Sequence, residues 1–384
     1  MRFSSRALSL AESETLRLSN TVARLRGEGQ DIIGLLEGEP DLPVPEAAIR
    51  ATEAALRAGK TKYSSSGGLT ELKTAIARKL KADNGVSAAP DGILITNGAK
   101  QAIYEILQAI CDPGDEVLIP APCWVTFPES VKLAGARAVL VPTGADHQIS
   151  IEALDKAVTA RTKAIILNTP NNPTGAVYPE AALRAVVAMA VKRDLVIIAD
   201  EAYEGLVYDG LKHVSVAALG EDAAKRTVTI QTCSKSFAMT GYRVGYAAGP
   251  VELVKNATRI HGHVTGNVCT FAQYGAIAAL GLSGEHRGSW RAAHEKRRDI
   301  AWELASKLFD GVRPQGGLFI FADAKKHLGA RFKDSAALAA HLLENGKVAV
   351  VPGSAFGREG YLRLSFSAPE ETLREGFARM GKVL

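Results

Sequence analysis

Between residues 93 and 248, short apolar runs alternate with amphipathic segments, and this alternation limits the possible folds more than any other feature of the chain. The runs are ILIT (93–96), VLIP (117–120), AVLVP (138–142), AIILN (164–168), LVIIAD (195–200), TVTIQ (227–231) and VGYAAG (244–249). Runs so poor in charge are typical of strands that are buried on both faces. Segments such as AKQAIYEILQAI between them have the pattern of helices. We therefore expect an α/β fold with a mostly parallel, seven-stranded sheet flanked by helices.

The chain changes character after about residue 285. A long charged helical segment is followed by fewer apolar runs, GGLFIFAD, KVAVVPG and YLRLSFS, which indicates a smaller α+β unit. A length of 384 residues also suggests about two domains. The first ~40 residues lie outside the alternating block, so we expect them to pack with the tail. The expected division is a large domain at 42–285 and a small domain made of 1–41 and 286–384.

Composition excludes several classes of protein. The net charge is +5 and the basic residues are scattered, which gives no case for a nucleic-acid or membrane partner. No apolar run reaches the ~20 residues of a membrane helix, and the early Glu12 and Glu14 argue against a targeting signal. The four cysteines have no metal-ligand spacing, so we expect no metal site and reduced thiols in a cytoplasmic protein.

Polar residues follow several of the apolar runs, and in open α/β sheets ligands bind beyond the carboxyl ends of the strands. Gly98, Ala99 and Lys100 follow the first run and open a helix, where free N–H groups suit a phosphate, although an ordinary turn is an alternative. Trp124 follows the second run, where it would cover a flat ring or simply pack in a core. Asn172 lies in TPNNPTG, a rigid polar loop after the fourth run.

The fifth and sixth runs are followed by ionisable residues. Asp200 ends an apolar strand, so it either meets a cation or caps a helix, and Tyr203 would share its helical face. Lys235 follows Thr232 in TCSKSFAMTGYR; a partly desolvated lysine is a nucleophile toward carbonyls, although most lysines are simply exposed. Arg243, in the same stretch, has the fork geometry that suits phosphate.

One further cation, Arg363, lies in the apolar run RLSFS of the tail and needs an anion, either a small carboxylate ligand or a structural Asp or Glu. Taken together, a lysine nucleophile, a carboxylate, an aromatic plane and an anion seat at one sheet edge describe one ligand well. That ligand is pyridoxal 5'-phosphate, which has an aldehyde, a ring nitrogen and a phosphate.

Nine motifs stand in one order along nearly the whole chain: GEPD, TKYSSSGG, TNGAKQA, PGDEVLIPAPCWVTFPE, NTPNNPTGAVY, DEAYEGLVYDG, SKSFAMTGYRVGY, VPGSAFG and RLS. With them the chain resembles the fold type I, class I/II pyridoxal-phosphate aminotransferases of the bacterial aspartate/aromatic subgroup. The resemblance implies a homodimer that moves an amino group from an L-amino acid, aspartate or a related aromatic one, to a 2-oxo acid such as 2-oxoglutarate in a ping-pong cycle.

The resemblance also implies a role for each matching residue toward the cofactor. Lys235 would bond the cofactor covalently and move the substrate Cα proton, while Asp200 would bind the ring nitrogen. Tyr203 and Asn172 would bond the phenolic oxygen, and Trp124 would stack on the ring. The phosphate would be held by a group of residues near the helix start and the lysine, with one tyrosine from the second subunit: Gly98, Ala99, Lys100, Thr232, Arg243 and Tyr63.

The resemblance likewise implies substrate contacts. Arg363 would clamp the α-carboxylate, helped by Asn172, Trp124 and the backbone of Gly38. Lys100 would meet a distal carboxylate, and Thr15 would lie near the same pocket.

Four departures from the family pattern leave aspartate specificity open. The segment AESET replaces K-P-S-x-T, Cys123 replaces a tyrosine, Tyr242 replaces a tryptophan, and HGHVTGNVC is an unusual loop. Its two histidines lack a third metal ligand, so we expect them to be packed or solvated.

Other enzyme classes fit less well. A pyridoxal-phosphate lyase would use the same residues and stays open as an alternative. A nucleotide-binding dehydrogenase would need a GxGxxG after the first strand, and the sequence has none. A non-catalytic cofactor sensor is disfavoured because the chain has Lys235, Asp200, Tyr203 and Arg363 together.

Overall fold

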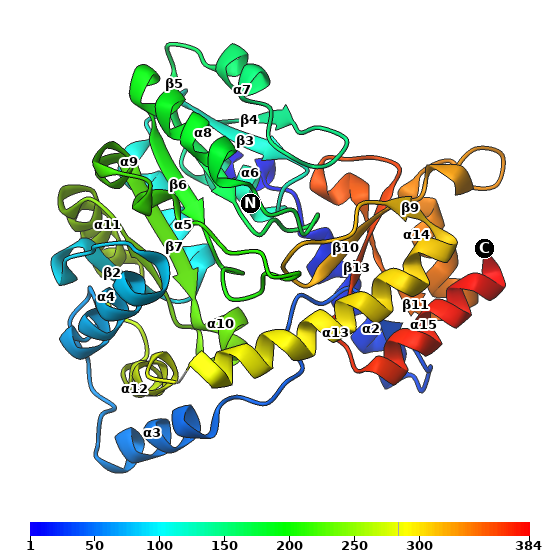
Figure 1. Cartoon of the computed structure of the whole chain (residues 1–384), viewed down its shortest axis with the longest axis horizontal. Helices are drawn as coiled ribbons and strands as arrows, with labels where there is room; N and C mark the ends of the chain where they lie inside the picture. Colours follow the sequence, from blue (N-terminus) through cyan, green and yellow to red (C-terminus); the bar gives the residue numbers. More distant parts are fainter. Residues whose placement is uncertain (283) are drawn as a thin grey trace.

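The computed structural model describes residues 1–282 and 284–384, and its centre is a seven-stranded sheet (Figure 1). The strands follow the order β2-β8-β7-β6-β5-β3-β4. They are β2 (Ile93–Thr96), β3 (Glu116–Ala121), β4 (Arg137–Pro142), β5 (Thr162–Asn168), β6 (Val196–Asp200), β7 (Thr227–Thr232) and β8 (Gly245–Ala248). Each predicted apolar run therefore forms a strand. The neighbours from β4 to β7 run parallel, and only β8 is antiparallel, to both β2 and β7, which confirms the mostly parallel α/β sheet.

Helices cover both faces of this sheet because successive strand residues point to opposite sides. Ile166 and Ile198 pack with α5 (Ala99–Ile110), α6 (Thr126–Leu133) and α11 (Val251–Val264). Ile165 and Ile197 face the other way, against α7 (Ile151–Ala157) and α8 (Glu180–Arg193). The remaining helices of this part are α3 (Glu46–Arg57), α4 (Thr70–Asn84), α9 (Glu221–Arg226), α10 (Cys233–Ser236) and α12 (Thr270–Leu280).

The tail and residues 14–36 lie together on one side of the molecule (Figure 1). A four-stranded sheet has the order β12 (Val351–Pro352), β13 (Tyr361–Ser365), β10 (Phe319–Asp323), β9 (Asp310–Gly311). Strand β1 (Ile33–Gly34) pairs with β11 (Val348–Ala349) in a separate parallel ladder. The helices here are α2 (Glu14–Gly27), α14 (Ser335–Gly346) and α15 (Glu370–Val383), and α13 (Gly284–Leu308) runs from the large sheet to this group. Helix α1 (Ser5–Ser9) instead lies beside α6.

Core contacts also join the two ends of the chain, because Val22, Ile32 and Leu36 pack with Phe321 and Ala349. Residues 22–36 thus lie against the tail, whereas α1 packs on α6 and the Ala11 amide donates to Glu129 of α6. The exact division at 41/42 and 285/286 stays a prediction. Within the part of the chain that the structure describes, no helix has both the length and the apolar character needed to cross a membrane.

The segment HGHVTGNVC, which we expected to be a loop, is partly helical. Its first four residues form the last turn of α11, and only from Thr265 onward is the chain irregular. The side chain of His261 is fully buried, and its Nδ1 lies 2.9 Å from Oε1 of Glu105 in α5. His263 is exposed. The helix continues through Gly262 because packing of α11 on α5 outweighs the low helix propensity of glycine.

Candidate active site

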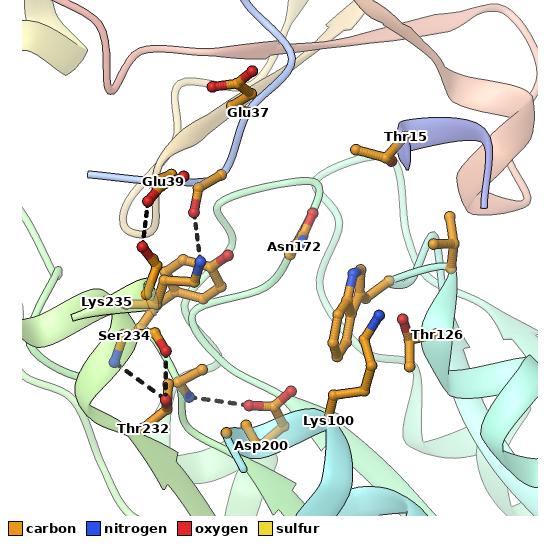
Figure 2. A pocket seen from close by; sticks show the side chains of 18 of the residues that line it. Thr15, Glu37, Glu39, Lys100, Thr126, Asn172, Asp200, Thr232, Ser234 and Lys235 are labelled. Carbon is orange, nitrogen blue, oxygen red and sulfur yellow. Dashed lines mark hydrogen bonds between the residues drawn. The ribbon is translucent and has the colours of Figure 1, made fainter. Parts of the chain in front are cut away.

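A cavity of about 510 Å³ lies at the carboxyl ends of β2, β5, β6 and β7, and segments from both ends of the chain close it (Figure 2). It brings together all but one of the residues that the sequence singled out: Thr15, Gly38, Gly98, Ala99, Lys100, Trp124, Asn172, Asp200, Tyr203, Thr232, Lys235, Arg243 and Arg363. The exception is Tyr63, which lies outside the cavity with 97% of its surface exposed. One cavity of this size suits a cofactor and a small substrate.

Lys235 reaches the cavity from α10, a single helical turn directly after β7. Thr232 caps this turn, since its Oγ1 accepts a hydrogen bond from the Ser234 amide at 3.2 Å. The Lys235 Nζ donates to the carbonyl oxygen of Gly38 at 2.6 Å, and no carboxylate of the described residues pairs with it (Figure 2). Burial lowers the pKa of Lys235 to about 8, although Glu39 opposes this. The amine therefore loses its proton far more readily than an exposed lysine.

Asp200 ends β6 between Asn168 of β5 and Ile230 of β7. Its Oδ1 accepts a hydrogen bond from the Ala202 amide at 3.0 Å, and burial raises its pKa to about 7. The expected helix after Asp200 is wrong, because residues 202–205 form turns. Tyr203 nevertheless lines the cavity; its ring meets Phe319 edge-on with 6.1 Å between the ring centres, and burial raises the pKa of its hydroxyl.

An anion seat forms where α5 begins. Gly98 has φ +81°, and a Cβ added there would lie 2.6 Å from Nη2 of Arg243. Arg243 donates to the carbonyl oxygens of Asn97 at 3.0 Å and Thr240 at 2.8 Å. The guanidinium, the free N–H groups of the first turn of α5 and the Thr232 hydroxyl thus border one part of the cavity. These groups fit a phosphate.

Arg363 is a buried cation on β13 with incomplete pairing. It donates to Asn172 Oδ1 at 3.1 Å and to the carbonyl oxygen of Leu36 at 2.6 Å, while its Nε has no partner among the described residues. Its guanidinium lies over the ring of Phe319, 4.1 Å from the ring centre. Burial lowers the pKa of Arg363 to about 10. No ion pair of the described residues includes Arg363, so the structural Asp or Glu is absent there and a ligand carboxylate fits.

The far wall of the cavity carries Trp124 and Lys100. The Trp124 ring meets Phe127 edge-on with 5.5 Å between the ring centres. The Lys100 Nζ lies 5.2 Å from the Trp124 ring centre, and burial and the charge of Arg243 lower the pKa of Lys100. Thr15, at the start of α2, lines the cavity on the same side as Lys100 and opposite Lys235 (Figure 2).

Several lining residues had not been singled out in the sequence. Asn168 accepts from the Asn172 amide at 2.8 Å and donates to the Asp200 carbonyl at 3.1 Å. It is the last residue of its strand, so the rule that located Asp200 would have found it. Glu39, which hydrogen-bonds the Thr240 hydroxyl, and Phe319 come from the small-domain side, where no strand-end rule applies.

The arrangement fits pyridoxal phosphate: Lys235 is an amine that loses its proton readily, and Asp200 is a buried acid with no ion-pair partner among the described residues. Trp124 forms an aromatic wall, and a side chain on Gly98 would obstruct the phosphate seat. Among the described residues, no group of three or more His, Cys, Asp or Glu is placed to hold a metal ion.

Comparison with known proteins points to the same class of enzyme as the residues of the cavity. The family model for aminotransferase class I and II matches residues 30–380. The chain is 44% identical to a probable aspartate/prephenate aminotransferase of Aquifex aeolicus, covering 99% of this chain and 98% of that one. It is 41% identical to an aspartate aminotransferase of Bacillus subtilis, covering 100% and 99%.

Solved structures give the same result. The aspartate aminotransferase from Thermus thermophilus with maleate superposes with a TM-score of 0.95 at 38% identity, covering 100% of both chains. Enzymes of this family exchange amino groups between amino acids and 2-oxo acids, and they are generally dimeric. The chain belongs to the class I and II aminotransferases, and pyridoxal 5'-phosphate is its cofactor.

Proposed function

We propose that this aminotransferase takes aspartate or a related amino acid, including aromatic ones, as donor and 2-oxoglutarate as acceptor. The observation that carries the proposal is the buried, incompletely paired Arg363 in the same cavity as Lys100. Two cations in one site suit a substrate with two carboxylates, whereas the ring of Trp124 beside Lys100 offers an apolar wall. The names of the relatives, aspartate and aspartate/prephenate aminotransferases, support this substrate class.

When bound, pyridoxal phosphate supplies an aldehyde that takes up the amino group and a ring that withdraws electrons from the substrate Cα. In our proposal, Lys235 is the covalent attachment point and later carries the proton away from Cα. Asp200 keeps a proton on the ring nitrogen, because a cation at its free oxygen would lower the raised pKa of its carboxyl again. Tyr203 and Asn172 hydrogen-bond the phenolic oxygen, and Trp124 stacks on the ring.

The remaining residues orient phosphate and substrate. We assign the phosphate to the seat around the start of α5, which consists of Gly98, Ala99, the Lys100 backbone, Thr232 and Arg243. Arg363 holds the α-carboxylate with Asn172, Trp124 and the backbone of Gly38 beside it. Fixing this carboxylate directs the Cα–H bond toward Lys235, so that the proton leaves rather than the carboxylate.

An initial-rate screen tests the proposed function. We expect aspartate and aromatic amino acids with 2-oxoglutarate to be converted at least about tenfold faster than lysine or alanine with the same acceptor. Rates that do not depend on an added 2-oxo acid, with release of ammonia, would show a lyase and contradict the proposal.

Lys100 tests recognition of the distal carboxylate. Lys100→Ala is expected to lower kcat/KM for aspartate by about 10- to 100-fold, because one charge-assisted hydrogen bond is worth about 1.5–3 kcal/mol. The values for phenylalanine should change by no more than about twofold. Cofactor affinity is the control, since only the Lys100 backbone belongs to the phosphate seat. Equal losses for both substrates would remove Lys100 from side-chain recognition.

Tyr63 tests the dimer. We propose that it hydrogen-bonds the phosphate in the second subunit, which accounts for a tyrosine with 97% exposure in the single chain. Tyr63→Ala is then expected to weaken binding of pyridoxal phosphate by roughly tenfold or more, as measured by absorbance titration. Tyr104→Ala, an aromatic deletion on α5 outside the cavity, is the control.

Mixed dimers sharpen this test. A dimer of one Tyr63→Ala subunit and one Lys235→Ala subunit contains one unaltered site only if Tyr63 acts across the interface. We expect half of the sites of such dimers to regain normal cofactor affinity and activity. If no normal site appears on mixing, Tyr63 does not act across the interface.

The four cysteines carry no disulfide, and three of them are buried. We propose the reducing cytoplasm as the location of the enzyme, because free thiols are normal there.

A further inference from the structure

A closed ring of polar side chains, four of them buried and one half-buried, lies behind the strand ends that form the cavity. Its five members, which we call the polar ring, are Lys79, Asn84, Glu201, Ser215 and Gln231. The Lys79 Nζ donates to Asn84 Oδ1 at 2.8 Å and to Gln231 Oε1 at 2.7 Å. Asn84 Nδ2 donates to Ser215 Oγ at 2.9 Å, and Ser215 Oγ donates to Glu201 Oε2 at 2.7 Å. Gln231 Nε2 closes the ring on Glu201 Oε2 at 3.1 Å.

Three further side chains attach to the polar ring. Glu204 Oε1 accepts from Lys79 at 2.7 Å, and the Tyr246 hydroxyl donates to Gln231 Oε1 at 2.6 Å. The His213 Nε2 lies 3.2 Å from Glu201 Oε2. The ring and its attached side chains together thus hold two carboxylates, Glu201 and Glu204, and one lysine, Lys79, largely shielded from solvent. Such buried charges are costly unless every partner is in place, so they are weak devices for stability alone.

The polar ring and the cavity share the same strand ends. Glu201 directly follows Asp200, Glu204 directly follows Tyr203, and Gln231 directly precedes Thr232. Adjacent residues of extended backbone point to opposite faces, so Glu201 and Gln231 lie behind the sheet end while their strand neighbours Asp200 and Thr232 line the cavity. The Glu201 amide also donates to the Ile230 carbonyl at 2.9 Å, which continues the pairing of β6 and β7 past Asp200.

Glu201 remains charged in this setting. Burial favours its neutral form, but His213 and the hydrogen bonds from Ser215 and Gln231 outweigh burial and hold the pKa of Glu201 below its ordinary value. Its charge adds to the burial that raises the pKa of Asp200. Among the described residues, the charged or titratable side chains that act on or near Glu201 are those of Asp200, His213, Glu204, Lys79 and Tyr246.

We propose that Glu201 is a positioning residue for the cofactor: clamped by the polar ring, it fixes the end of β6 behind Asp200 and adds negative potential that helps to hold the proton on the cofactor. This inference rests on the proposed role of Asp200. The effect of Glu201 on the bound cofactor depends on its negative charge, so a neutral side chain that makes the same hydrogen bonds would not produce it.

The test is a pH titration of the holoenzyme, followed by the visible absorbance of the cofactor bound to Lys235. The quantity measured is the pH midpoint of the absorbance change. Glu201→Gln keeps the size of the side chain and removes its charge. We expect the midpoint to fall by about one pH unit, since a nearby negative charge favours the protonated form and Glu201→Gln removes that charge. Lys79→Gln removes a positive charge from the same ring, and the midpoint is expected to rise.

Tyr246→Phe is the matched control, because it deletes a ring hydrogen bond without changing the charge. Its midpoint should stay within about 0.2 units of the unaltered enzyme, since it changes no charge. Equal shifts in Glu201→Gln and Tyr246→Phe would reduce Glu201 to a packing role and overturn the inference. An unshifted Glu201→Gln enzyme would do the same, while a normal rate in Asp200→Asn would overturn the role of Asp200 itself and the inference with it.

Discussion

Replacing Lys235 with alanine is expected to lower the rate of transamination by at least about 10³-fold, while the protein still binds pyridoxal phosphate through its phosphate seat. The loss is large because one side chain serves as attachment point and as proton carrier, and a positioned acid–base group alone contributes about 10²–10⁴-fold. Single-turnover rates with aspartate, and borohydride fixation followed by peptide mass measurement, check the two roles. Fixation should occur on residue 235 of the unaltered enzyme only.

The matched control is Lys192→Ala, which removes an exposed lysine of α8 outside the cavity. It should leave both rate and fixation unchanged. Near-normal turnover in Lys235→Ala would contradict the proposed roles.

The lowered pKa of Lys235 adds a test on the unaltered apoenzyme. With a pKa of about 8, the neutral amine predominates above pH 8 rather than above 10.5. The rate of covalent cofactor capture should therefore rise with pH and level off above about pH 8. A rate that keeps rising to pH 10 would show that the amine is exposed.

Asp200→Asn is expected to lower kcat by about 10²–10³-fold, the range seen when one preorganised electrostatic partner of a developing charge is removed. Asparagine keeps the size of the side chain and its acceptor for the Ala202 amide. The change therefore isolates the negative charge that retains the proton on the cofactor's ring nitrogen. Stopped-flow measurement of substrate Cα proton loss, with deuterated aspartate, reads the affected step directly.

Asp194→Asn is the control for this change, because Asp194 is an exposed carboxylate at the end of α8. It should not alter the rate. If Asp200→Asn retained the full rate, the ring nitrogen would not need a charged partner, and the assignment of Asp200 would be wrong.

The sequence predicted the large sheet well because its strands are buried on both faces. Runs such as ILIT and AIILN have no charged residue to place at a solvent-facing position, so the sequence alone indicates that these strands are buried. The antiparallel direction of β8 could not be predicted from the sequence, since an apolar run has the same pattern in a parallel and in an antiparallel strand. The turns after Asp200 and the helical His261 were mispredicted because tertiary packing decided the backbone there.

The candidate site was predictable to the extent that it lies at strand ends. Asp200, Asn172 and Lys235 each follow an apolar run, and the cavity collects them. Glu39 and the polar ring could not be predicted, because their partners lie far away in the chain: Lys79 and Gln231, for example, are separated by 152 positions. Side-chain hydrogen bonds of that kind depend on the finished packing and leave no local pattern.

The antiparallel direction of β8 has a consequence for how this site is built. A parallel neighbour of β7 would have required a crossover that carries the chain to the opposite edge of the sheet and back. With β8 reversed, residues 233–244 never leave the ligand edge, and this one connection delivers both Lys235 and Arg243. A single stretch of backbone thus sets the distance between Lys235, proposed to bind the aldehyde, and Arg243, proposed to bind the phosphate. A one-residue insertion there would move one of these residues relative to the other even if the rest of the fold stayed intact.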